Sequence, residues 1–444
     1  MIVGKVLITG GFGWLDIGDE AMPRTFIDQL REHTPDVDIC LISPLPEATS
    51  DYHGERSVQC IAQYLSSRIR IPLVNRHLPG RVSRFIRETQ LLISVKWPVL
   101  GRRLPDYVQR LMEEFAGCAV LVNVGGGNIN SLIPEELLIK TFYWTLAAVN
   151  GKPVVVSGQN MGPFKTNRHK KRVLKAMKHV SVMTFRDRDI SVRRLGSAMP
   201  ASMLYFDAGD DAYNLKPASK KSVIKILEDE FSSAPFEKKY LVGFNLKASL
   251  SLFGANDETL DEMGKKCAVL LDKISQKYDC NIIMIPTDYS SGADDRKVHR
   301  LIIGNMLRKD NVFPIEKLFH DRELKTVCSL CDFVMSSRYH CCVFTASSGV
   351  PFLGYANGSY QLTKLQGLCE LLDMPNLFIP ENFTDISIDV CMERIESVFS
   401  RLDEIKTDLK DRSRLIAEKS GILPYIVADM AGERNQRAIR DLDL

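Results

Sequence analysis

The sequence lacks any apolar run that approaches the roughly 20 residues needed to cross a bilayer. Its N-terminus has neither the charged lead nor the small-residue cleavage site of a signal peptide. It also lacks an excess of either charge, with 58 Lys and Arg against 55 Asp and Glu. Nucleic acid is therefore not expected as a partner, because neutralising phosphates normally requires a strong basic excess. With 444 residues, of which 45% are hydrophobic and 25% charged, the chain is predicted to be a globular cytoplasmic protein of two domains.

The cysteines do not form the pattern of a disulfide framework or of a metal site. There are eleven of them, an odd number, scattered from Cys40 to Cys391. Cys328 and Cys331 are spaced C-S-L-C, but no second pair at zinc spacing follows them. We therefore predict reduced cysteines that pack as small hydrophobic residues. Because the sequence shows no cluster of metal ligands, we also predict that the protein holds no metal.

Short apolar runs recur along the whole chain, with longer amphipathic stretches between them. Runs of Val, Ile and Leu without alternation suit parallel strands that are buried on both faces. Strands that alternate with helices favour an α/β fold with parallel sheets. The predicted strands are Val3–Thr9, Ala119–Val124, Pro153–Val156, Ser181–Phe185, Tyr240–Asn245, Asn281–Ile285, Phe333–Met335 and Pro351–Tyr355, and the predicted helices include Ile133–Asn150 and Asp257–Tyr278.

A polar stretch near the middle of the chain, Asp207–Ser222, has no apolar periodicity and is predicted to link two domains. We predict Rossmann-like domains over residues 1–210 and 223–415, followed by a closing helix over 416–444. Ligands of such folds bind at the carboxyl ends of the parallel strands. The active site is therefore expected in the cleft between the two domains.

Residues 66–110 break the charge balance, with ten Lys or Arg against Glu88 and Asp106 (10 − 2 = +8). Aromatic residues such as Phe85 and Trp97 are interleaved with these charges. One interpretation is a surface that meets a membrane or an anionic, lipid-linked substrate. The other, which we favour, is an amphipathic helical insertion with a solvated basic face.

Three glycine-rich turns follow predicted strands of the N-terminal half, over residues 10–20, 124–130 and 157–163. Glycine lets the backbone turn tightly and approach a ligand, and a following helix offers N–H groups to an anion. The first turn departs from the dinucleotide-binding fingerprint and is not a P-loop. Each turn could instead be structural, but their shared position predicts one rim of a cleft. The candidate residues on this rim are Gly11, Gly13, Asp16, Asp19, Gly126, Gly127, Asn128 and Gln159.

Two predicted strand ends carry arginine. Arg186, beside Asp187, could hold a carboxylate or phosphate in a bidentate manner, or form an internal ion pair with its neighbour. The segment S-S-R-Y-H (336–340) opens an apolar helix over Cys341–Ser348. Arg338 and His340 would there combine anion binding with acid–base capacity at a helix N-terminus.

Taken in order, these segments resemble the polysaccharide pyruvyl transferase family, which has the two-Rossmann architecture called GT-B. The resemblance spans about residues 5–375. It implies transfer of the enolpyruvyl carbons of phosphoenolpyruvate to two sugar hydroxyls of a glycan or glycan precursor, such as one of exopolysaccharide biosynthesis, as a cyclic ketal with release of phosphate. The motifs that carry it are G-G-F-G-x-L-D-I-G-D-E-A, G-G-G-N, G-Q-N-M-G-P, F-R-D-R-D-x-S, S-S-R-Y-H, and S-G-V-P-F-L-G-Y followed by Lys364 and Gly367.

The same resemblance implies roles for individual residues. Arg186 and Arg338 would hold the carboxylate and phosphate of phosphoenolpyruvate, with the backbone N–H of Tyr339 as a further donor. His340 would serve as the general acid and base, and the residues of the glycine turns would face a carbohydrate acceptor in the N-terminal domain. The chain departs from the family at Asp16, where Asn is more common. Phosphoenolpyruvate is a co-substrate, so no cofactor is implied.

Two other functions stay open at this point. A GT-B glycosyltransferase with a nucleotide-sugar donor would need an acidic residue to hold the ribose, and Glu370 is the candidate in the C-terminal half. A non-catalytic sugar-binding protein could share the fold, although the presence of Arg338 and His340 argues against it. The sequence also leaves open whether the chain forms homo-oligomers and whether residues 66–110 contact a membrane peripherally.

Overall fold

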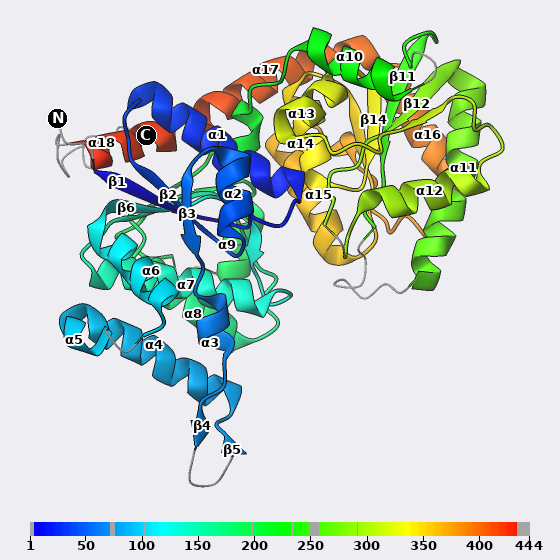
Figure 1. Cartoon of the computed structure of the whole chain (residues 1–444). Coiled ribbons are helices and arrows are strands. Elements are labelled where there is room, and N and C mark those ends of the chain that lie inside the picture. The colour runs from blue at the N-terminus through cyan, green and yellow to red at the C-terminus, as the bar shows by residue number, and fades with distance from the viewer. Residues whose placement is uncertain are drawn as a thin grey trace. The chain divides into compact units, whose positions relative to one another are not determined.

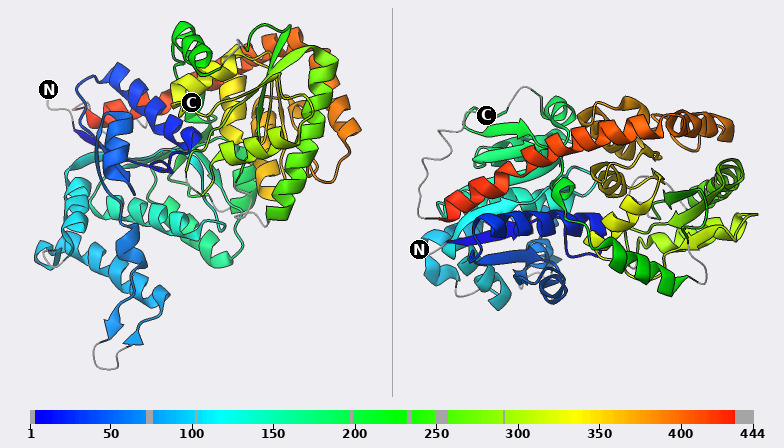
Figure 2. Two further views of the ribbon diagram at one scale, coloured as in Figure 1. Left: turned by 45° about the vertical axis from the view of Figure 1, so that its right-hand side comes forward. Right: turned by 90° about the horizontal axis from the view of Figure 1, so that it is seen from above.

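The computed structural model describes residues 4–71, 76–101, 104–196, 199–231, 235–248, 257–290 and 292–432. It divides into two compact units, each an α/β unit with its own parallel sheet (Figures 1 and 2). The first unit runs to Trp14, continues over Phe26–Asp207 and resumes at Gly421. The second unit comprises Leu15–Thr25 and Ala208–Ser420.

The sheet of the first unit has the strand order β10-β9-β8-β6-β1-β2-β3, and β7 pairs with β8 beside this path. Neighbouring strands are parallel, as the sequence predicted. The strands are β1 (Lys5–Thr9), β2 (Ile39–Ser43), β3 (Arg56–Gln59), β6 (Cys118–Asn123), β7 (Gly126–Ile129), β8 (Val154–Met161), β9 (Val182–Phe185) and β10 (Leu204–Asp207). The helices are α2 (Pro46–His53), α3 (Ala62–Ser66), α4 (Gly80–Lys96), α5 (Pro98–Gly101), α6 (Asp106–Gly117), α7 (Pro134–Val149), α8 (Asn167–Met177), α9 (Arg188–Leu195) and α18 (Ile422–Ala431).

Helices cover both faces of this sheet, which explains why its strands are apolar without alternation. In β1, Leu7 packs into a core that includes residues of α6, α7 and α8. Its neighbours Val6 and Ile8 pack into a second core with α18 and the later turns of α1 (Ile17–His33). Because successive side chains of a strand point to opposite faces, a strand between two cores is apolar at every position.

The sheet of the second unit has the order β13-β12-β11-β14-β15, again with parallel neighbours. The first turns of α1 pack into the core of this unit through Ile17, Ala21 and Met22. The strands are β11 (Tyr240–Asn245), β12 (Cys280–Met284), β13 (Val312–Pro314), β14 (Phe333–Ser336) and β15 (Phe352–Gly354). The helices are α10 (Lys220–Glu230), α11 (Asp257–Tyr278), α12 (Asp295–Asn305), α13 (Asp321–Leu330), α14 (Tyr339–Ser347), α15 (Ser359–Leu371), α16 (Ile388–Phe399) and α17 (Leu402–Ser420), with 3-10 turns at Asp211–Asn214 and Pro375–Leu377.

The predicted linker is not a solvated connection. Asp210, Asp211 and Tyr213 are buried, and Tyr213 and Leu215 belong to the core of the second unit. The stretch is polar because its aspartates serve a buried site, described below, so the absence of apolar periodicity misled the prediction. The units also differ in extent from the predicted ranges, because Leu15–Thr25 packs with the second unit and α18 with the first. Within the predicted closing helix, α17 ends at Ser420 and α18 begins at Ile422, while residues 433–444 lie outside the described part.

The basic insertion is mostly helical, as favoured from the sequence. It contains the short antiparallel hairpin β4 (Arg70–Ile71) and β5 (Arg76–His77), then α4, α5 and the start of α6. None of the helices in the described ranges is long and apolar enough to span a membrane. All eleven cysteines are free in the structure, and all but Cys60 are buried, as expected of cysteines that pack as small hydrophobic residues.

Candidate active site

The strongest constellation of polar residues lies at the switch point of the second sheet. There β11 is flanked by β12 on one side and β14 on the other, and ligands of doubly wound sheets bind at the carboxyl ends of such strands. The two strands end in register, with Asn245 opposite Ser336. The chain then places Lys247 after β11 and Arg338 and His340 after β14.

Arg338 is held by three aspartates, none of which the sequence analysis connected with it as a partner. Its Nη2 donates to Asp295 Oδ1 (2.7 Å) and Asp288 Oδ2 (3.0 Å), and its Nη1 donates to Asp16 Oδ2 (3.1 Å). Asp295 and Asp288 are buried with it, whereas 28% of the Asp16 side chain is exposed. Burial alone would lower the pKa of Arg338, but the three carboxylates outweigh it and raise that pKa. The guanidinium is therefore a fixed positive centre.

Asp295 anchors the whole strand edge. Its Oδ1 also accepts from the backbone N–H of Ala248 (3.1 Å), and its Oδ2 accepts from Asn245 Nδ2 (3.2 Å) and from the backbone N–H of Thr287 (3.1 Å). It stands at the first position of α12, where a carboxylate suits the helix N-terminus. Asp295 thus connects the residues that follow β11 and β12 to Arg338, and its role is structural positioning.

Asp16 has two internal partners instead of an open carboxylate. Its Oδ1 accepts from the backbone N–H of Gly18 (3.2 Å), which makes it the N-cap of α1. Its Oδ2 accepts from Arg338, and the backbone N–H of Ile17 donates to the Thr287 carbonyl (2.8 Å). Burial alone would raise the pKa of Asp16, but Arg338 and other nearby cations outweigh it and lower that pKa. The sequence prediction that Asp16 serves the acceptor missed this attachment to Arg338.

His340 lies between two carboxylates and against a glycine. Its Nε2 is 3.5 Å from Oδ2 of the buried Asp210, and its Nδ1 is 3.9 Å from Oδ1 of the more exposed Asp19. A side chain at Gly18 would overlap the Cβ, Cγ and Nδ1 atoms of His340, so this position requires glycine for close approach. The imidazole thus lies against Gly18, with its Nε2 facing Asp210 and its Nδ1 facing Asp19.

Two lysines increase the positive potential beside Arg338. Burial is the main reason that the pKa of Lys247 falls to about 8, and Arg338 and Lys364 lower it further, against the opposing effect of Asp16 and Asp295. Lys364 also lies over the rings of Tyr360 (4.9 Å) and Tyr339 (5.9 Å). An anionic ligand beside such a lysine would stabilise its charged form and raise its pKa again.

The same corner also brings metal-ligating atoms together. One ligand atom each of Asp16, Asp19 and His340 lies within 4.8 Å of the others. The sequence analysis saw no such cluster, because His340 is far from the two aspartates along the chain. The donor set suits a divalent cation poorly, since both oxygens of Asp16 already accept hydrogen bonds and Arg338 and Lys247 repel a cation.

The remaining predicted residues lie in the first unit, at the corresponding edge of its own sheet. Gly11 and Gly13 follow β1, Gly126 and Gly127 begin β7, and Gln159 lies in β8. Gln159 is fully buried, and its Nε2 donates to the carbonyls of Gly126 (2.6 Å) and Asn160 (2.8 Å). The structure thus uses Gln159 to hold β7 against β8, which is a structural role and not the predicted one at a rim.

Asn128 is the residue of this group whose surroundings point to a ligand. It is 7% exposed, and neither atom of its side-chain amide has a hydrogen-bond partner among the described residues. A buried amide without partners is costly and needs an explanation such as a bound ligand or water. The neighbouring glycines are partly structural: Gly126 has a φ of +115°, and a Cβ at Gly125 would overlap the carbonyl oxygens of Ser157 and Gly158.

Arg186 follows β9 and is 2% exposed. The adjacent Asp187 accepts from Ser191 Oγ (2.5 Å) and from Asn160 Nδ2. Burial raises the pKa of Asp187 despite these bonds and the nearby charge of Arg186. Burial is likewise the main cause that raises the pKa of Asp207 to about 6. Of these two carboxylates, Asp187 is the one that interacts with the charge of Arg186.

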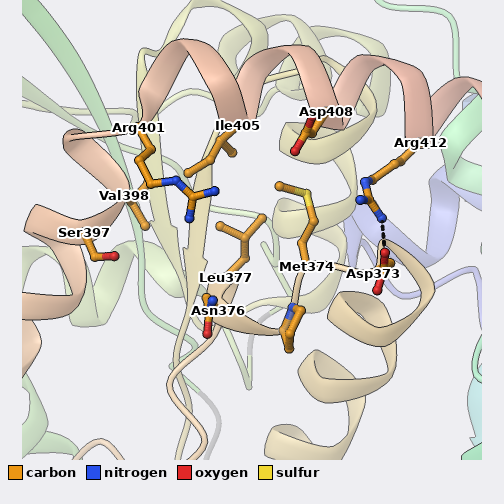
Figure 3. Close-up of a pocket in the computed structure, with 11 residues that line it drawn as sticks. Asp373, Met374, Asn376, Leu377, Ser397, Val398, Arg401, Ile405, Asp408 and Arg412 are labelled. Carbon is orange, nitrogen blue, oxygen red and sulfur yellow. Dashed lines mark hydrogen bonds and ion pairs between the residues drawn. The ribbon is translucent and has the colours of Figure 1, made fainter.

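Glu370, the candidate ribose-binding residue of a glycosyltransferase, is exposed on α15 and accepts from Gln366 Nε2 one helical turn earlier (2.7 Å). A separate pocket of about 220 Å³ in the second unit is lined by residues of α16 and α17 and of the turn at Pro375–Leu377 (Figure 3). There Arg412 points to Asp373, with 2.8 Å between Nη1 and Oδ2. None of the residues predicted for the active site lines this pocket.

Two parallel sheets with these strand orders form two Rossmann-like units, which is the fold class called GT-B. Among solved structures, UDP-GlcNAc 2-epimerase from Neisseria meningitidis bound to UDP-GlcNAc is 12% identical, with a TM-score of 0.56, over 95% of this chain and 99% of that one. A glycosyltransferase from Rickettsia africae is 10% identical, with a TM-score of 0.55, over 97% and 100%. MurG from Acinetobacter baumannii is 9% identical, with a TM-score of 0.52, over 96% and 99%. At these identities the likeness shows the fold alone.

The family follows from the sequence itself. Residues 16–359 match the polysaccharide pyruvyl transferase family. The chain belongs to that family and is a transferase of the polysaccharide pyruvyl transferase type. No curated protein matches the chain at a significant level.

Proposed function

We propose that the enzyme uses phosphoenolpyruvate as its donor and converts two sugar hydroxyls of a carbohydrate acceptor to a pyruvate ketal. The observation that carries this proposal is the group of cations around His340. Arg338 is fixed by buried aspartates, and Lys247 and Lys364 add positive charge; burial, with Arg338 and Lys364, lowers the pKa of Lys247 to about 8. Phosphoenolpyruvate carries a carboxylate and a phosphate, which are groups that Arg and Lys side chains bind through charge-assisted hydrogen bonds.

His340 is the proposed acid–base group. In the overall reaction the two acceptor hydroxyls lose two protons, of which one ends on the methylene carbon and the other on the departing phosphate. Asp210 faces Nε2, which leaves Nδ1 on the side of Asp19 as the atom that exchanges the proton. Imidazole can both deliver a proton to the methylene carbon and accept one from a hydroxyl near neutral pH.

The structure changes the proposed role of Arg338. Both of its terminal nitrogens are engaged by carboxylates. We therefore propose that Arg338 attracts the donor through its charge, and that the donor takes the place of the partly exposed Asp16 on Arg338. Lys247 and Lys364 are the proposed direct contacts of the donor. Asn128 and Arg186 are proposed ligand contacts of the first unit.

The test is to incubate the enzyme with phosphoenolpyruvate and a panel of oligosaccharides, and to measure released phosphate and the mass of the sugar product. The proposal predicts release of one phosphate for each sugar that gains the mass of pyruvate less one water. His340→Ala should abolish both signals, and Arg300→Ala, a change at an exposed residue, should leave them unchanged. A sugar that gains a hexose from a nucleotide sugar, with no phosphate from phosphoenolpyruvate, would overturn the proposal in favour of a glycosyltransferase.

A further inference from the structure

Helix α4 exposes apolar side chains in addition to those that it packs against its own unit. Leu91 is buried in the core of the first unit, and Leu92 and Val95 pack against that core. The exposed large hydrophobic residues are Val82, Phe85, Ile86 and Ile93 of the helix and Trp97, which directly follows it. A helix that only had to pack on its own unit would carry polar residues at these five positions.

The five exposed residues form one stripe. Positions 82, 86, 93 and 97 follow the spacing of one helix face, and Phe85 lies next to them. Phe85 is 68% and Trp97 60% exposed, and Val99 of the following α5 is 70% exposed and continues the apolar surface beyond the end of α4. In two views α4 and α5 lie at the periphery of the first unit (Figures 1 and 2). We call this surface the α4 stripe.

Cations border the α4 stripe. Arg81 and Lys96 are exposed on α4, and Arg68 is exposed shortly after α3, which packs against α4. The acidic residue of α4, Glu88, is already paired with Arg172 (2.8 Å), so its charge is neutralised. An apolar stripe with exposed aromatic residues and a basic border complements a surface that is apolar inside and anionic outside.

We infer that the α4 stripe binds the surface of an anionic lipid bilayer, with α4 lying in the plane of the interface. A second copy of the chain fits less well, because a self-complementary contact would bring the same cationic borders together. The binding places the enzyme at a membrane without a spanning helix. It is independent of the donor proposed above, because the stripe shares no residue with the candidate active site.

The experiment measures sedimentation of the full-length protein with vesicles of phosphatidylglycerol and phosphatidylcholine in equal parts, and with vesicles of phosphatidylcholine alone. The wild type should bind the anionic vesicles much more tightly, and binding should weaken as salt is added. Phe85→Ser and Trp97→Ser should each weaken binding about tenfold, because each removes a large apolar side chain from the interface. Arg81→Glu and Lys96→Glu should each weaken binding to anionic vesicles by about tenfold or more.

Matched control variants distinguish this binding from nonspecific adsorption to vesicles. Leu307→Ser removes the most exposed leucine of the second unit (91%), and Lys309→Glu reverses an exposed charge there. Both should leave vesicle binding unchanged, and all variants should retain the wild-type circular dichroism spectrum. The inference is overturned by the absence of vesicle binding, by equal binding to neutral vesicles, or by equal loss in the controls. A dimer in solution that Phe85→Ser dissociates would assign the stripe to a second copy instead.

Discussion

The contact between Gly18 and His340 gives the sharpest test of the site's geometry. Gly18→Ala would place a methyl group into the imidazole at its Cβ, Cγ and Nδ1 atoms. Forcing extra volume into a filled space costs about 1–3 kcal/mol of unfolding free energy. His340→Gly removes all three of these atoms, so in its background Gly18→Ala should cost nothing and gain up to about 1 kcal/mol in helix propensity. The two changes should therefore couple by about 1–3 kcal/mol.

The assay is differential scanning calorimetry of the four proteins of this cycle. For a unit of this size each kcal/mol corresponds to about 2–4 °C in the unfolding temperature. Gly18→Ala should also lower kcat toward the His340→Ala level, a loss of about 10²–10⁴-fold. Additive effects on stability would show that the imidazole does not lie against Gly18, and would refute the reasoning.

Four further predictions follow from the charges around Arg338. Asp16→Asn keeps the helix cap and removes a negative charge beside the donor, so phosphoenolpyruvate should bind about tenfold more tightly by calorimetry; weaker binding would contradict this. Lys247 is protonated below about pH 8, so the affinity for the donor should be constant below that pH and fall as the pH rises through it. Lys247→Arg should remove this pH dependence, because arginine stays charged. Arg338→Met leaves buried carboxylates without their counter-ion, so it should lower the unfolding free energy of the second unit by about 3–5 kcal/mol in denaturant unfolding. A loss near zero would show that Arg338 does not stabilise this unit. EDTA should leave turnover unchanged despite the grouping of Asp16, Asp19 and His340; inactivation that a divalent cation reverses would assign them as metal ligands.

Much of the fold could be predicted because parallel strands buried on both faces leave a clear trace in the sequence. Tyr240–Asn245 and Asp257–Tyr278 were predicted with the bounds that the structure shows. Strand β3 (Arg56–Gln59) was missed, because it lies at the edge of its sheet and is polar and partly exposed. The buried stretch around Asp210 was taken for a linker, because polarity in a sequence does not distinguish a solvated carboxylate from a buried one that serves a histidine.

The candidate site could be predicted only in part. Arg338 and His340 stand out because they follow a strand and open a helix, where anions bind. Their partners do not, because Asp16 is 322 positions from Arg338 along the chain and meets it only through the fold. Asp288 lies in the polar loop after β12 and Asp295 at the start of α12, and such positions signal a strand end but not which cation the carboxylate serves. Lys247 has no local motif, and its low pKa arises from burial and from cations on other segments.

The most direct test of the central claim, that the site around Arg338 and His340 binds phosphoenolpyruvate, is isothermal titration calorimetry of the full chain with phosphoenolpyruvate and, separately, with UDP-N-acetylglucosamine. Lys247→Met removes one proposed donor contact without touching the aspartates that hold Arg338, and Lys309→Met is the matched control. The account predicts binding of phosphoenolpyruvate that Lys247→Met weakens at least about tenfold, as loss of a buried charge-assisted contact implies, and that Lys309→Met leaves intact. Binding of the nucleotide sugar in place of phosphoenolpyruvate would contradict it.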